Sequence, residues 1–103
     1  LLGDFTDSNF QDADLTLANL EAATLHGCNL DGTELDKALL LDTDFTDSNW
    51  WRAKGLTTDT IEDLLRSFPP STQIKPEWEK DFKLWLTEFT VSRDKSPPKD
   101  PQP

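Results

Sequence analysis

A large apolar residue recurs every five residues over the first half of the chain. The series runs without interruption from Phe5 to Trp50, and the residue two places before each member is small. An α-helix requires apolar spacings of three and four, and a strand requires a spacing of two, so a strict period of five fits neither element. The repeat therefore predicts a periodic structure that is neither an α-helix nor a single long strand. The large positions are Phe5, Phe10, Leu15, Leu20, Leu25, Leu30, Leu35, Leu40, Phe45 and Trp50.

The residue between the small and the large position is usually Asp or Asn, as at Asp4, Asn9 and Asp14. With this pattern of small, Asp or Asn, and large residues, positions 1–54 resemble the pentapeptide-repeat family. The resemblance implies that four repeats make one square coil, with the large and the small positions pointing inward, so that positions twenty apart stack. We therefore expect a mainly β fold, a short right-handed quadrilateral (pentapeptide-repeat) β-helix of about 2.5 coils with a C-terminal two-helix cap.

The repeat register ends where Gly55 occupies a large position. Asp59, with Glu62 three residues later, predicts the N-cap of a short helix. Pro76 predicts the first residue of a second helix. From Ser92 onward the residues are charged, Ser, Gln or proline and have nothing to bury, which is typical of a flexible tail. The expected domains are a repeat β-helix (1–54), a helical cap (55–91) and a flexible Pro-rich tail (92–103).

All of the excess negative charge lies in the repeat. Residues 1–50 contain eleven acidic residues and one base, Lys37, whereas residues 51–103 contain nine of each. The net charge of −10 disfavours direct binding to nucleic acid or to a membrane surface. The outward carboxylates either keep the repeat soluble or attract a basic partner. The candidate acidic surface consists of Asp4, Asp7, Asp44, Asp47, Asp14, Glu34 and Asp36.

Apolar residues also occupy outward positions. Leu39 and Leu41 flank the inward Leu40, and we expect the C-terminal helices to pack over them, with a binding patch as the alternative. The aromatic stripe of the second helix either covers the open end of the repeat or anchors the helix in a groove of a partner. The candidate apolar contact patch consists of Leu39, Leu41, Trp51, Trp78, Phe82, Trp85 and Phe89.

An active site is not predicted. The single histidine, His26, follows an inward leucine and should face solvent, whereas the single cysteine, Cys28, occupies a small inward position. Their opposite directions argue against a Cys–His nucleophile or a metal pair. Carboxylates on a convex surface are not desolvated, so they are poorly suited to acid catalysis. We therefore expect no catalytic residues, no metal, no cofactor and no enzymatic activity.

These features predict a non-catalytic protein–protein interaction or scaffold module that presents a rigid acidic prism. The resemblance implies an alternative, an acidic DNA mimic that regulates a DNA-binding enzyme such as gyrase. Two and a half coils rise only ~12 Å beside ~34 Å for one turn of DNA, so this alternative requires further coils upstream. The chain has no methionine and its register already runs at Gly3, which predicts an excerpt of a longer protein.

The expected partner is another protein with a basic surface. Self-association through an open β-helix end is a further hypothesis. The longest apolar run has four residues, which predicts a soluble segment, with the cytoplasm as the default location.

Overall fold

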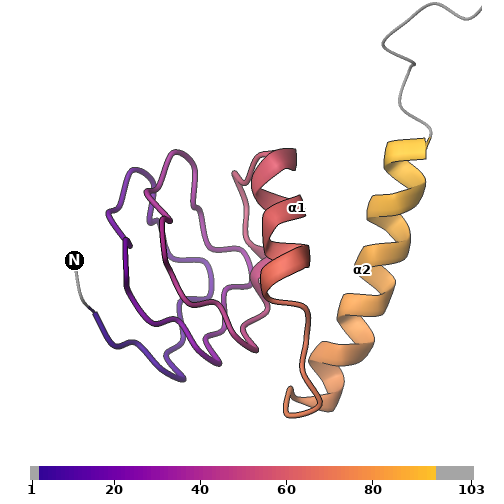
Figure 1. Cartoon of the computed structure of the whole chain (residues 1–103), viewed down its shortest axis with the longest axis horizontal. Helices are drawn as coiled ribbons and strands as arrows, with labels where there is room; N and C mark the ends of the chain where they lie inside the picture. The colour runs from indigo at the N-terminus through magenta and orange to yellow at the C-terminus, as the bar shows by residue number, and fades with distance from the viewer. Residues whose placement is uncertain (1–2, 95–103) are drawn as a thin grey trace, which may run out of the picture.

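The computed structural model describes residues 3–94 (Figure 1). The regular elements of this range are a short 3₁₀ helix, η1 (Trp50–Arg52), and two α-helices, α1 (Thr58–Ser67) and α2 (Pro76–Asp94). Residues 3–54 form the repeat winding, in which the chain returns to an equivalent position every twenty residues. The repeat winding, α1 and α2 follow one another along the longest axis of the molecule, and the N-terminal end of the winding lies farthest from the helices (Figure 1).

The predicted fold class is wrong. A mainly β, right-handed quadrilateral β-helix requires strands, and residues 3–94 contain no strand and no sheet. Successive coils contact each other through isolated parallel bridges between residues twenty apart, which run from Asp4 with Thr24 to Glu34 with Lys54. The physical reason lies in the corners. A turn at every fifth residue leaves too few extended residues on one side of the coil for consecutive bridges to form.

Each corner of the repeat winding contains one residue with left-handed backbone. The hydrogen bond from Ser8 N–H to Phe5 O, at 2.9 Å, closes a four-residue turn whose third residue, Asp7, has a φ of 61°. A positive φ at the third residue is the signature of a type II turn. The corner residues with positive φ are Asp7, Asp12, Leu17, Ala22, Gly27, Gly32, Lys37, Asp42 and Asp47.

Where an Asp or Asn precedes the large residue, its side chain stabilises the corner. Its Oδ1 accepts a hydrogen bond from the backbone N–H two residues further on, as in Asp4 with Thr6 and Asn29 with Asp31, both at 3.1 Å. The same Asx turn forms at four further corners of the described chain. Asp and Asn both supply this acceptor, which explains why they alternate at one position of the repeat.

The inward positions form the core of the repeat winding. Leu25 and Leu30 are fully buried. Small inward hydroxyl groups are satisfied by the coil below, since Thr33 Oγ1 donates to Phe10 O and Thr43 Oγ1 donates to Leu20 O, both at 2.7 Å. The core therefore contains no buried side-chain nitrogen or oxygen without a partner among the described residues.

The N-cap of the first helix lies two residues earlier than predicted. Thr57, rather than Asp59, is the N-cap, and its Oγ1 accepts a hydrogen bond from Thr60 N–H at 3.2 Å. Asp59 instead lies in the first turn, where a carboxylate interacts favourably with the helix dipole. On its other face α1 buries Leu64 against the end of the winding, and α1 therefore closes part of that end.

The second helix begins at Pro76, as predicted, and continues to Asp94. It therefore includes residues 92–94 of the segment predicted to be a flexible tail. Residues 95–103 of that segment lie outside the described residues.

A substitution at the centre of the core tests the inward assignment. Leu25→Asp places a carboxylate among apolar side chains, and we expect it to destabilise the fold by several kcal/mol. Leu17→Asp is the matched control, because Leu17 is exposed and the change should be close to neutral. The check is urea unfolding followed by circular dichroism, and equal midpoints for the two variants would contradict the assignment.

Gly55 ends the repeat winding, and no larger residue fits there. Its φ is +83°, and a Cβ atom at this position would lie 2.7 Å from the backbone nitrogen of Asp36. We expect Gly55→Ala to destabilise the protein by about 1–3 kcal/mol, through overpacking and an unfavourable φ. Lys54→Ala, at the exposed neighbouring position, is the control. A thermal midpoint of Gly55→Ala equal to that of the control would contradict the close approach.

Candidate functional site

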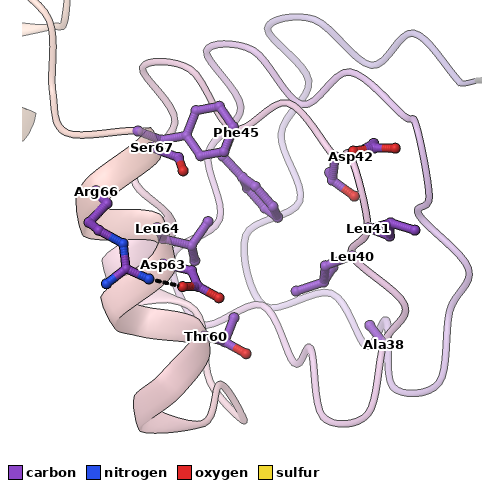
Figure 2. A pocket seen from close by; sticks show the side chains of 12 residues that line it. Ala38, Leu40, Leu41, Asp42, Phe45, Thr60, Asp63, Leu64, Arg66 and Ser67 are labelled. Carbon is purple, nitrogen blue, oxygen red and sulfur yellow. Dashed lines mark hydrogen bonds and ion pairs between the residues drawn. The ribbon is translucent and has the colours of Figure 1, made fainter.

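A pocket of about 700 Å³ lies between the last coil of the repeat winding and α1 (Figure 2). It exists because the chain turns into α1 after Gly55, so that residues 38–43 have a helix rather than another coil above them. Ala38, Leu40 and Phe45 line it from the winding, and Leu64 lines it from α1. The pocket is therefore the space that an additional coil would have filled.

The pocket has an apolar floor and a polar rim. Leu40 points from the winding toward α1, and Leu64 projects from α1 toward the winding, whereas Leu41 points away from the helix (Figure 2). On the rim, Asp63 forms an ion pair with Arg66 of the same helix. Asp42 is exposed on the opposite side of the pocket.

The carboxylates predicted to form an acidic surface lie in two columns on different sides of the winding. Asp4 and Asp44 share a column through Thr24, whereas Asp14 and Glu34 bridge to each other in the second. Glu34 and Asp44 are partly buried, and the exposed members are Asp4, Asp7, Asp14 and Asp36.

Asp47 is not part of an acidic surface, since it is only 8% exposed. Its carboxylate accepts hydrogen bonds from Ser71 N–H at 2.9 Å and from Ser71 Oγ at 2.7 Å. Asp47 therefore joins the loop between α1 and α2 to the repeat winding, which is a structural role.

Three of the column carboxylates are held in the ionised form. Hydrogen bonds from the hydroxyl and backbone of the threonine two residues further on lower the pKa of Asp4, Asp14 and Asp44. In Asp44 the Thr46 hydroxyl donates to Oδ1 at 2.5 Å. The same bonds fix the orientation of each carboxylate, so the charges form a defined pattern on the winding.

The residues predicted to form one apolar patch are separated in the structure. The helices do not pack over Leu39 and Leu41 as expected, because these side chains are 51% and 67% exposed. Trp51 is only 4% exposed and lies under α2, with its ring 5.0 Å from that of Phe82. The other predicted members of the patch lie on α2 and are partly buried, namely Trp78, Phe82, Trp85 and Phe89.

The sequence analysis did not identify the ion pair that holds α2 in place. Arg52 donates from Nε to Asp81 Oδ2 at 2.7 Å and from Nη2 to Oδ1 at 2.6 Å, and Trp51 Nε1 donates to the same carboxylate at 2.9 Å. These hydrogen bonds lower the pKa of Asp81. The signal in the sequence that could have identified this pair is Asp81, a carboxylate on the aromatic face of α2 between Trp78 and Trp85.

Comparison with protein families identifies the repeat. Residues 4–40 match the family model for pentapeptide repeats in eight copies. Residues 4–40 therefore consist of pentapeptide repeats. Pentapeptide-repeat proteins are generally protein-interaction modules and typically have no catalytic activity. A comparison with curated proteins found no match.

The two residues of this chain that are best suited to nucleophilic or metal chemistry point in different directions. His26 is exposed, whereas Cys28 is fully buried and its Sγ donates to Phe5 O at 2.9 Å. Burial raises the pKa of the Cys28 thiol, which disfavours the reactive thiolate. Within residues 3–94, no group of three or more His, Cys, Asp or Glu side chains is arranged to hold a metal ion. No helix in the same range is long and apolar enough to cross a membrane.

The Arg52–Asp81 pair predicts a dependence of stability on acidic pH. The pKa of Asp81 is lower in the folded state than its unfolded value of about 3.9. The ionised carboxylate therefore stabilises the fold fully at pH values above the unfolded pKa. The contribution is lost as the pH falls through the folded pKa. We expect Asp81→Asn to destabilise the protein by about 1 kcal/mol at pH 7, and to a lesser extent near pH 2.

Urea unfolding between pH 7 and pH 2 measures this difference. Asp36→Asn, which removes an exposed carboxylate of the winding, is the control. A stability difference between wild type and Asp81→Asn that stays constant over this range would contradict the role of the pair.

Proposed function

We propose that this chain is a non-catalytic binding module whose repeat winding presents ionised carboxylates to a basic protein partner. The observation that supports it is an excess of acidic side chains in the repeat, three of which, Asp4, Asp14 and Asp44, are held in fixed orientations by Asx turns. Among the side chains that the structure describes, the ion pairs Arg52–Asp81, Arg66–Asp63 and Lys83–Glu79 all lie after residue 50. The eleven acidic residues of positions 1–50 have one lysine, Lys37, in the same segment.

Fixed carboxylates favour binding in two ways. The Asx turns orient the side chains of Asp4, Asp14 and Asp44 before a partner arrives, which reduces the conformational entropy lost on binding. The excess of negative charge increases the rate of encounter with a basic surface, and this effect decreases as salt is added. A module of this kind is expected to bind with strong salt dependence and without chemical change of its partner.

The repeat offers a substitution that removes charge and preserves structure. Asn occupies the Asp position at Asn9, Asn19 and Asn29 and forms the same Asx turn. The triple variant Asp4→Asn, Asp14→Asn, Asp44→Asn should therefore keep the fold and lose three fixed charges. We expect wild type to capture basic proteins from a lysate at about 0.1 M salt and to release them at about 0.5 M, and the variant to capture far less.

Equal thermal midpoints of wild type and variant show that the comparison is valid. Capture of the same basic proteins by the variant at about 0.1 M salt would contradict the proposal. Inhibition of supercoiling by DNA gyrase, by wild type and not by the variant, would instead favour the DNA-mimic hypothesis.

A further inference from the structure

On one side of the repeat winding, residues 18–22 are hydrogen-bonded to the coil above them. The Leu20 N–H donates to Leu39 O at 2.9 Å, and the Ala22 N–H donates to Leu41 O at 3.0 Å. In the reverse direction, the Leu39 N–H donates to Ala18 O at 2.9 Å. This side of the lower coil therefore presents two donors and one acceptor to the next coil.

The same side of the upper coil, residues 38–42, has no coil above it. The groups equivalent to those of the lower coil are the N–H of Leu40, the N–H of Asp42 and the C=O of Ala38. Within the described part of the chain, these three backbone groups form no hydrogen bond. The preceding side of the upper coil is covered, since Leu35 N–H donates to Lys54 O. On the following side, the N–H groups of Phe45 and Asp47 also have no backbone acceptor among the described residues, but both residues are buried. The accessible part of the unpaired edge is therefore residues 38–42.

A different solution is found where the chain enters η1. There the side chain of Asn49 takes the place of a backbone carbonyl of the upper coil, because its Oδ1 accepts the Leu30 N–H at 2.5 Å. Its Nδ2 donates to Asn29 Oδ1 at 3.1 Å. No side chain of the described residues closes the edge at Leu40 and Asp42 in this way.

The unpaired edge lines the pocket described above. Ala38, Leu40 and Asp42 all contribute to the pocket, which α1 bounds on the opposite side (Figure 2). Leu40 is only partly buried, whereas Leu20, one coil below, is 7% exposed. The volume of about 700 Å³ lies within the range of roughly 300–1,000 Å³ that ligand sites occupy.

The charges around the pocket favour a basic occupant. Asp42 is exposed on the rim beside the unpaired N–H group, and on the other side Arg66 is paired with Asp63. The rim therefore has a net negative charge, and it adjoins a repeat with ten more negative than positive residues.

We propose that this edge and pocket, here called the peptide groove, bind an extended basic segment of a partner protein. The inference rests on the proposed binding function and specifies the chemistry of the partner. In the register of the repeat, one peptide residue donates its N–H to Ala38 O and accepts from the Leu40 N–H. The next residue places an apolar side chain over Leu40, and the third accepts from the Asp42 N–H. An extended backbone supplies this donor and these two acceptors at the required spacing.

A synthetic peptide of sequence Lys-Ala-Lys-Leu-Lys-Lys provides the probe. Its leucine is the apolar residue, and the lysine before it supplies the N–H for Ala38. N-methylation of that lysine removes the donor, and we expect a loss of affinity of about fivefold or more. N-methylation of the leucine is the matched control, because in this register its N–H points away from the groove.

Amide hydrogen exchange measured by NMR locates the bound peptide. We expect the amides of Leu40 and Asp42 to exchange quickly in the free protein and at least about tenfold more slowly with saturating peptide. The amides of Leu20 and Ala22, which are already paired, provide the internal reference.

A variant that fills the pocket tests the apolar contact. Ser67→Trp introduces a large side chain at a lining position and should abolish peptide binding. Thr58→Trp, on the same helix at an exposed position outside the lining, should leave binding unchanged.

The inference is overturned if no binding is detected up to about 1 mM peptide, or if neither N-methylation nor Ser67→Trp affects binding. Protection of the Leu40 and Asp42 amides in a dimer without peptide would also overturn it, since a second copy would then be the occupant. Sedimentation at the NMR concentration detects such a dimer.

Salt-sensitive capture of basic proteins by the carboxylates, combined with no peptide binding in the groove, would refute this inference alone. Failure of capture together with specific peptide binding would refute the acidic surface and retain the groove.

Discussion

The turn at every fifth residue is the constraint on which the rest of this molecule depends. It requires left-handed backbone at the corners and room inside for one large and one small residue per side, and at six corners a side-chain acceptor stabilises the turn. Seven of the described residues other than glycine adopt the positive φ, which costs energy at each corner. The bridges between coils and the Asx turns together offset that strain, so a single corner would not be stable outside the stack.

Much of this organisation could be predicted from the sequence, because it depends on local patterns. The family resemblance carried by the period of five implied the twenty-residue stacking that pairs Asn9 with Asn29, and Pro76 predicted the start of α2. The strand content was predicted wrongly, since the number of extended residues between two turns depends on backbone geometry that composition does not reveal. The N-cap was misplaced for a similar reason. Thr57 and Asp59 are both good caps, and only the path of the chain after Gly55 selects between them.

The candidate sites depend on contacts between distant segments, and sequence reasoning was weaker there. Asp47 belongs to the same pattern as the exposed acids, yet Ser71 binds its carboxylate. Trp51 follows the repeat at an outward position, yet α2 covers it and Asp81 accepts from its indole nitrogen. The pocket beside Leu40 could not be predicted, because it exists only through the angle at which α1 leaves the winding.

The side chain of Asn49 shows how such a stack can be ended. One amide replaces a peptide group of the next coil, so the Leu30 N–H remains satisfied although the chain has turned into η1. The coil therefore changes its backbone path without leaving an unpaired donor in the coil below, because an asparagine stands where the backbone carbonyl turns away. A departure from the repeat geometry can in this way be tolerated locally, at the cost of one specified side chain.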